Sequence, residues 1–542
     1  MLGVAVFTAD PDADLEYSLA EWRRWRKRRR IEELAWIDAL YHAELTGIIC
    51  AIAFYALAGL IGGEALTAGQ MADVTRTGTA WLGLAAAVAL GVGLRSGSRG
   101  GPLVLEQADV RHVLMSPVDR RRALLGPAVR QLRFQLFVAA SGGLAVGFLA
   151  AHRLSGSTAG WMASATVFAL ATLALSYGAA LVASSLRLPS WAGTWLAIGL
   201  VAAAAADVAG LIPASPTAPW GRIGMWPVQP AWPGILAVVI SLVVLAVGLV
   251  RLGRVSLELA ERRSRLVGQL RFAATLQDVR TVVVLRRQLA LELPRIRPWV
   301  RLRVRGSEPR AVWRRGLRGA LRWPAARVGR LVMLGVVAGL ALRGAFAGTT
   351  PLLALAGAAL FVAGLDATEA MAQELDHPSL TESVPVEKSS LRVQHLPVAV
   401  AVMVLVAAVG VVAAVLVEPG RGALEVALIC APAAALGGLA GAGASLISTP
   451  DPVEALLMPP EVTGAYQAFR IARPLVLATG GTLPVLAARA AANGSGQATA
   501  AAASAAVVVM GAFGVFVVWL RNREVLQQML QTAVNPKKDD RP

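Results

Sequence analysis

Residue types that carry out chemistry are few in this 542-residue chain and stand apart from one another. No Gly-x-x-x-x-Gly-Lys-Ser/Thr stretch occurs, and the only lysines are Lys27, Lys388, Lys537 and Lys538, which excludes a P-loop ATPase. The five histidines lie singly, without His-Glu-x-x-His or paired-cysteine spacing, so no metal site is expected. The sequence therefore indicates a protein without a catalytic site or a cofactor of its own.

The densest group of metal-ligating residue types is Glu374, Asp376 and His377, directly before Pro378. It can be interpreted as a ligand set or as a polar inner loop, and the loop is favoured. The two cysteines, Cys50 and Cys430, both lie in apolar segments, so a disulfide framework of the secreted kind is not expected.

The elements that carry these residues are apolar segments of membrane-spanning length. A helix rises about 1.5 Å per residue and a bilayer core is about 30 Å thick, so roughly 20 mostly apolar residues make one crossing. The sequence predicts an all-α, polytopic membrane protein of about twelve transmembrane helices in two pseudo-repeated six-helix halves. The predicted spans lie near 45–62, 79–94, 134–151, 161–186, 192–212, 234–250, 331–347, 351–365, 397–417, 423–447, 474–492 and 498–520.

Basic residues are distributed unevenly between the two sides of this pattern. With a cytoplasmic N-terminus, forty-six of the 52 Lys and Arg residues fall on the inner side. The positive-inside rule then places both termini in the cytoplasm and the protein in the cell membrane. The sequence predicts five regions: 1–44, an N-terminal segment; 45–250, the first half; 251–330, a basic linker; 331–520, the second half; and 521–542, a C-terminal tail.

A net charge of +18 would suggest nucleic acid as a partner in a soluble protein. Here 56% of the residues are hydrophobic, and the arginines lie where anionic lipid headgroups would meet them, so the bilayer is the expected partner and nucleic acid is not. Basic segments that contain Trp22 and Trp25, or Trp313 and Trp323, precede the two halves. They suit interfacial helices, although ordinary positive-inside flanking explains them equally well.

Two inner loops share an order of residue types. Pro117-Val118-Asp119-Arg120 follows the second span of the first half, and Pro385-Val386-Glu387-Lys388 follows the second span of the other half. This match favours a weak internal duplication. A third inner stretch, 450–473, contains Met458 and Pro460, which echo Met115 and Pro117.

Two further features concern the packing of the spans. The outer loop 213–233 is rich in proline and tryptophan, which predicts a re-entrant or membrane-lying cap. Gly437 and Gly441 form a small-xxx-small pair that permits close approach of helices, either as static packing or as a sliding surface.

The stretches DVRHVLMSPVDRRR at 109–122 and ELDHPSLTESVPVEK at 374–388 resemble the membrane subunit of an ABC-2-type exporter, in the large two-half, type V-like form of actinobacteria. The resemblance implies that these inner loops act as coupling segments that dock on an ATPase. It assigns that role to Pro117, Asp119, Arg120, Arg121, Arg122, Pro385, Glu387, Lys388, Met458 and Pro460.

The resemblance also implies the other subunits and segments of an exporter complex. A separate cytoplasmic ABC ATPase, in two copies, would hold ATP and Mg²⁺, and one permease chain would supply both membrane units. The Trp-containing basic segment would be the connecting helix that precedes the first span. The substrate is not identified by any residue, although an apolar path is compatible with a hydrophobic one.

Two other functions remain open on the sequence. A non-transporting scaffold or assembly factor of the cell envelope would equally lack polar groups within its spans. An ion-coupled secondary transporter is disfavoured, because such proteins place carboxylates or histidines at mid-span, whereas Asp207, Asp366, Glu369 and Glu425 all lie near predicted span ends.

Overall fold

A computed structural model shows how the chain folds, and it describes residues 66–98, 100–103, 105, 119–255, 298–300, 311–376, 388–417, 420–447, 472–494 and 496–534, with Glu21, Glu44 and Tyr55. This part is helical, and it contains no strand. The chain divides into two compact units, Met1–Leu285 and Arg286–Pro542. Each unit has its own apolar core clusters.

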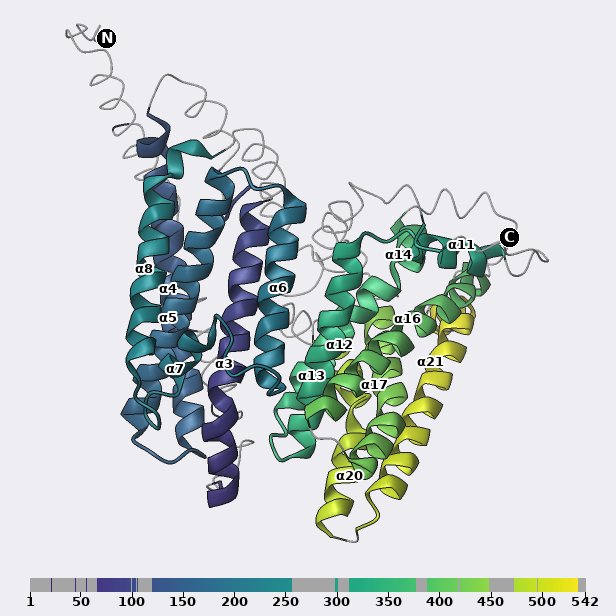
Figure 1. Cartoon of the computed structure of the whole chain (residues 1–542). Helices are drawn as coiled ribbons and strands as arrows, with labels where there is room; N and C mark the ends of the chain where they lie inside the picture. Colours follow the sequence, from purple (N-terminus) through teal and green to yellow (C-terminus); the bar gives the residue numbers. More distant parts are fainter. Residues whose placement is uncertain are drawn as a thin grey trace, which may run out of the picture. The chain divides into compact units, whose positions relative to one another are not determined.

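The first unit is a bundle of long helices (Figure 1). Helix α5 lies at its centre, because it contacts α3, α4 and α8. Side chains cap the N-termini of three helices. Thr67 and Gln70 form a capping box at the start of α3, Asp119 caps α4, and Ser157 caps α5. Its elements are α3 Ala68–Gly97, α4 Arg120–Ala151, α5 Thr158–Ser185, α6 Ser190–Val208, α7 Ala218–Gly224, α8 Trp232–Val250 and the 3₁₀ turn η2 Leu252–Arg254.

The second unit is built around α12, α13, α16 and α17 (Figure 1). Helix α12 packs against α13 and α16, and α17 packs against the same two helices. Its largest core cluster joins residues from all four helices, including Leu360, Met403 and Leu439. Its elements are α11 Ala311–Ala320, α12 Ala325–Phe346, α13 Leu352–Ala367, α14 Glu369–Asp376, α16 Lys388–Val417, α17 Arg421–Ile447, the helical segment Ala472–Gly480, α20 Leu483–Asn493 and α21 Ala498–Val534.

By length and composition, nine helices of the described part could cross a membrane, and two bent pairs would bring the number to eleven. Every predicted span from 79–94 to 498–520 falls on one of these helices or pairs. The predicted span 45–62 lies outside the described residues, apart from Tyr55. The all-helical, multi-pass prediction is confirmed, whereas the number twelve and the two-half repeat stay predictions.

Several helices extend beyond the predicted apolar segments. Helix α4 begins at Arg120 and not near residue 134, and α12 begins at Ala325 and not at 331. Helix α21 continues to Val534, so much of the expected C-terminal tail is helical. Hydropathy marks where a helix is apolar, and it does not detect polar turns that local caps and ion pairs keep helical.

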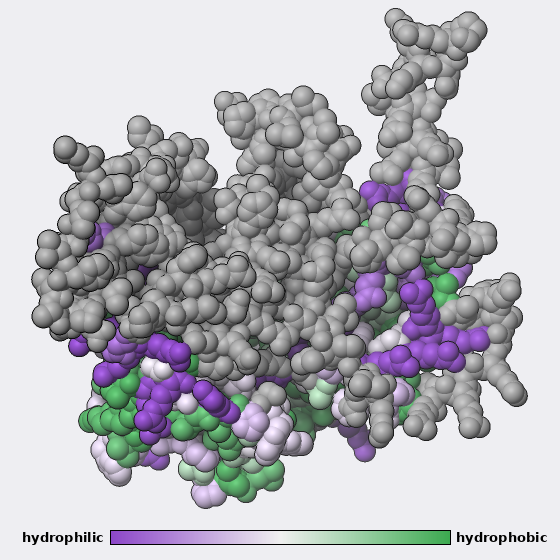
Figure 2. Space-filling model, turned by 90° about the horizontal axis from the view of Figure 1, so that it is seen from above, coloured by the Kyte–Doolittle hydropathy of each residue, from purple (hydrophilic) through white to green (hydrophobic). Residues whose placement is uncertain are grey.

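The outward faces of the helices are apolar, as a lipid environment requires. Trp191 and Trp195 on α6 are each 67% exposed, and Leu416 on α16 is 77% exposed. Seen from above, the surface shows green apolar patches beside purple hydrophilic ones (Figure 2). Exposed apolar area on this scale would be an aggregation hazard in water, and it suits contact with lipid chains.

Small residues set the distances between the helices. A Cβ atom on Gly93 of α3 would overlap the backbone of Ser176 on α5, and one on Gly339 of α12 would overlap Gly410 on α16. Such crossings need glycine, because the backbones touch directly. The units are therefore held by close backbone packing as well as by apolar side chains.

Candidate functional site

The first candidate coupling segment lies at the start of α4. The Asp119 side chain caps the helix by accepting a hydrogen bond of 3.0 Å from the backbone N–H of Arg121. Arg120, Arg121 and Arg122 follow on the first turn, and all three are exposed. The Nε atom of Arg122 lies 3.8 Å from Asp119 Oδ2. Pro117 lies outside the described residues. The segment is thus a capped helix start that presents three cations to solvent.

The residues directly after the arginines are anchored in the core. Ala123 and Leu124 are 3% and 4% exposed and belong to the same cluster as Leu181 of α5 and Leu252 of η2. The turn η2 directly follows α8. A force on the exposed arginines would therefore pass at once to α4, to α5 and to the end of α8.

The second-half candidates are only partly placed. Lys388 is the first residue of α16. Pro385, Glu387, Met458 and Pro460 lie outside the described residues. The structure therefore does not bring this set together, and its coupling role stays a prediction.

The predicted interfacial tryptophans of the second half lie on and after α11. Trp313 is half-buried on α11, which packs against α16. Trp323 lies in the turn between α11 and α12 and packs against the largest core cluster. Trp299 donates hydrogen bonds of 2.9 Å from its backbone N–H to the Leu321 carbonyl and from Nε1 to the Trp323 carbonyl. Trp22 and Trp25 lie outside the described residues.

A buried ion-pair network joins α12 to the bend after α13. Arg327 is 6% exposed, and its guanidinium lies 3.0 Å from Glu369 Oε2 while donating to the Asp366 carbonyl. Arg330 pairs with the Asp366 carboxylate. The Trp323 ring lies against Arg327, 4.0 Å from the guanidinium carbon to the ring centroid. These groups lie where α13 and α14 meet at 62°.

A second polar contact lies next to this network. Glu374 on α14 and His395 on α16 are joined at 2.8 Å between Oε1 and Nε2, and His395 is 6% exposed. Glu374 thus contacts a residue distant in the sequence, and His377 lies outside the described residues. No metal-binding group of three His, Cys, Asp or Glu residues occurs in the described ranges.

The sequence interpretation of Asp366 and Glu369 as simple boundary residues missed this pairing. A partial signal was available: Arg327 and Arg330 are three residues apart on one helix, so they occupy one face, and two acids lie three residues apart near the end of the next predicted span. The bend between α13 and α14 separates Asp366 from Glu369, so helical spacing alone does not place the two acids on one face. The network compensates each carboxylate with an arginine, so it provides a fixed junction.

The proline-rich loop 213–233 contains a short buried helix. Helix α7 packs against α3, α5 and α8, and Trp220 is 6% exposed. The Trp220 Nε1–H donates to Ser241 Oγ at 2.9 Å, near the middle of α8. The backbone N–H of Ser215 donates to Asp207 at 2.7 Å. The segment is therefore built into the bundle, which agrees with a re-entrant arrangement; its outer location stays a prediction.

Gly437 and Gly441 lie on the face of α17 that meets the segment Ala472–Gly480. A Cβ atom at Gly437 would stand against Gly481 Cα, and one at Gly441 would meet the Pro474 carbonyl. These contacts show the close packing that the small-xxx-small spacing predicts.

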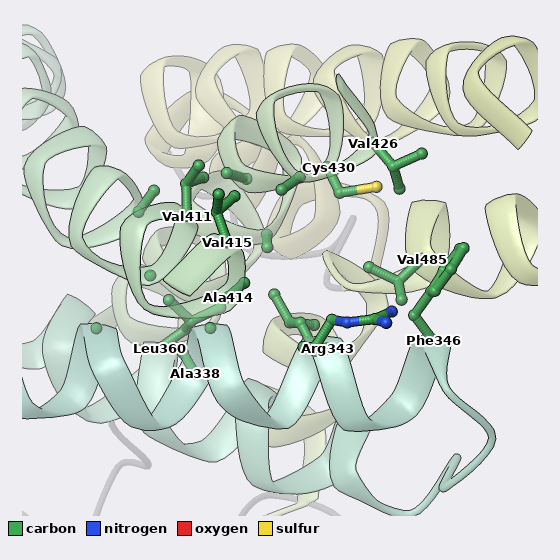
Figure 3. A pocket seen from close by; sticks show the side chains of 18 of the residues that line it. Ala338, Arg343, Phe346, Leu360, Val411, Ala414, Val415, Val426, Cys430 and Val485 are labelled. Atoms are coloured by element: carbon green, nitrogen blue, oxygen red, sulfur yellow. The ribbon is translucent and has the colours of Figure 1, made fainter. Parts of the chain in front are cut away.

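A narrow cavity lies within the second unit, walled mainly by α12, α16 and α17, with Leu360 of α13 and Val485 of α20 (Figure 3); the space open to the centre of a water-sized sphere is about 70 Å³. Its lining is almost entirely Ala, Val, Leu and Gly, with Arg343 and Phe346 on α12 and Cys430 on α17 as the exceptions. The Arg343 side chain extends toward Phe346 and Val485 (Figure 3). Nothing in the sequence pattern predicted this cavity, because its walls come from five separate helices.

The helices and the surface together define the chain as a multi-pass helical membrane protein. Within that class, no protein-family model, no curated protein and no solved structure matches the chain. A more specific function can therefore be proposed only from its own residues.

Proposed function

We propose that this chain is the membrane-spanning permease subunit of an ATP-driven ABC-2-type exporter. A separate cytoplasmic ATPase, in two copies, would bind at the coupling segments, and one permease chain would supply both membrane units. The resemblance of residues 109–122 and 374–388 to such permeases supports this proposal. The lack of a P-loop motif in the sequence is compatible with an ATPase on a separate chain.

One observation carries the proposal. Three exposed arginines, Arg120, Arg121 and Arg122, stand on the first turn of a helix whose next two residues are buried in the core. An acidic surface on an ATPase would complement these charges, and such pairs steer and orient a partner. Because the turn is capped and anchored, docking there would move α4 as a rigid lever.

The mechanism would be a transfer of work through helices. Closure of the ATPase pair on ATP would push the start of α4, and the shared cluster around Leu181 and Leu252 would carry this displacement to α5 and to the end of α8. Movement of these helices would open a path for the substrate. The described helices offer mainly apolar surface, which is compatible with a hydrophobic substrate.

The test is co-purification of the chain with a P-loop ATPase from its native membrane in mild detergent, followed by ATPase measurements on the complex. The triple change Arg120→Glu, Arg121→Glu and Arg122→Glu should abolish complex formation and the stimulated ATPase rate. Arg187→Glu is the matched control, because Arg187 is also exposed and follows α5, which packs antiparallel to α4, so it lies at the end of the bundle where α4 begins.

Three results would contradict the proposal. Unchanged complex formation by the triple variant would remove the coupling role of these arginines. Enrichment of cell-envelope synthases without any ATPase would favour a scaffold or assembly factor. Transport that continues without ATP and stops when an ion gradient is collapsed would instead indicate an ion-coupled transporter.

A further inference from the structure

The cavity of the second unit runs lengthwise along the bundle. On α12 its lining extends from Gly335 to Phe346, and on α17 from Ala423 to Ala434. Each stretch spans eleven residue steps, which at 1.5 Å per residue corresponds to about 16 Å. The space open to the centre of a water-sized sphere is about 70 Å³ over this length, so the slot is about one hydrocarbon chain across.

This length corresponds to one leaflet of a bilayer. Helix α12 has 22 residues, or about 33 Å, so it matches a hydrocarbon core of about 30 Å. Arg343 lies in the last turn of α12, whereas Gly335 lies near its middle. The slot therefore reaches from headgroup depth to about the midplane.

The slot is apolar inside and cationic at its mouth. Its deep end is formed by residues such as Leu360, Val406 and Ala434, and the described lining contains no Asp or Glu. Arg343 gives the lining its formal positive charge. An arginine in the last turn of a span can reach the headgroup region, and a guanidinium is well suited to bind phosphate through paired hydrogen bonds.

We propose that this slot binds one anionic glycerophospholipid. One acyl chain would fill the space between α12, α16, α17 and α20, and the phosphate would lie against Arg343. The slot is too narrow for two chains, so the second chain would stay in the bilayer. This proposal does not depend on an ATPase partner, because the slot lies within one unit of this chain.

Native mass spectrometry of the purified, delipidated full chain tests the proposal, with phosphatidylglycerol, phosphatidylcholine or a free fatty acid added in turn. Wild-type protein should hold one phosphatidylglycerol in preference to the other two ligands. Arg343→Gln should lower phosphatidylglycerol affinity about tenfold, as expected for the loss of a charged hydrogen bond. The matched control is Arg489→Gln, since Arg489 lies on α20 and outside the lining.

A filling variant tests the slot itself. Ala427→Trp should abolish binding of every lipid, whereas Ala503→Trp, at an exposed position of α21, should not. If Ala427→Trp fails to fold, as judged by size-exclusion chromatography, Ala414→Phe fills the slot from α16 instead. In a Cys50→Ser background, phosphatidylglycerol should also slow the alkylation of Cys430, which lines the slot.

Each contrary result would overturn the assignment. Equal binding of phosphatidylcholine, or unchanged affinity in Arg343→Gln, would remove the headgroup role of Arg343. Tighter binding of the free fatty acid would replace the phospholipid as occupant. Retention of lipid by a folded filling variant would show that the lipid lies on the outer surface and not in the slot.

Discussion

Arg327 and Glu369 form an ion pair of 3.0 Å that is buried on both sides and ties α12 to the first residue of α14. Removing one partner leaves the other charge without compensation. Glu369→Ala should therefore lower the free energy of unfolding by about 3–5 kcal/mol, measured by denaturant titration in detergent. Glu425→Ala, at an exposed position of α17, should leave the unfolding midpoint unchanged.

The double variant Arg327→Met with Glu369→Leu gives the complementary measurement. Replacing both charges by apolar side chains should recover most of the stability, since a buried ion pair is strongly costly only when it is broken. A double variant as unstable as Glu369→Ala would show that the 62° bend depends on the charges themselves.

Adjacent glycines before α20 should respond differently to the same change. A Cβ atom at Gly481 would lie 2.7 Å from Gly437 Cα, whereas one at Gly480 would meet nothing within 4 Å. Gly481→Ala should destabilise the protein by about 1–3 kcal/mol through overpacking, and Gly480→Ala should not. The melting temperatures of the two variants test this difference. Equal values would mean that α17 can shift enough to accommodate the added methyl group at this crossing.

The buried helix α7 should depend on Trp220. Trp220→Phe keeps the apolar ring and removes the hydrogen bond to Ser241, which should cost about 0.6 kcal/mol, the average for interhelical bonds in a membrane protein. Trp220→Ala should cost about 3–5 kcal/mol, because it also empties the packing site. Exposed Trp191→Ala on α6 is the control in the same unfolding assay. A large loss of stability in Trp220→Phe would show that the hydrogen bond, and not the packing of the ring, provides most of the stabilisation.

The predicted orientation can be tested across a single helix. Arg187 and Leu211 lie at opposite ends of α6 and are both exposed. In a protein without Cys50 and Cys430, Leu211→Cys in whole cells should react with a membrane-impermeant maleimide. Arg187→Cys should react only after the membrane is opened. The reverse pattern would contradict the positive-inside assignment of both termini.

The positions of the long helices could be predicted from the sequence, because membrane spans are governed by local composition. Every predicted span within the described ranges corresponds to a helix or a bent pair. The breaks after Ala367 and after Gly480 could not be predicted in this way. They depend on what surrounds them, such as the arginines of α12 that meet the residues around the first break.

The candidate sites show the same division between local and distant contacts. The start of α4 could be anticipated, since Asp119 before three arginines is a local capping pattern. The pairing of Glu374 with His395 and the slot beside Arg343 join residues from separate helices. A hydropathy pattern carries no information on which helices become neighbours, so these features required the fold.

The two hydrogen bonds of Trp299 have a mechanical meaning. Trp299 precedes α11 in the second unit, and the two bonds hold it to Leu321 and Trp323 beyond that helix. A load on the backbone at Trp299 would therefore pass directly to Trp323, four residues before Arg327. It would reach the Arg327–Glu369 ion pair before it stretched α11.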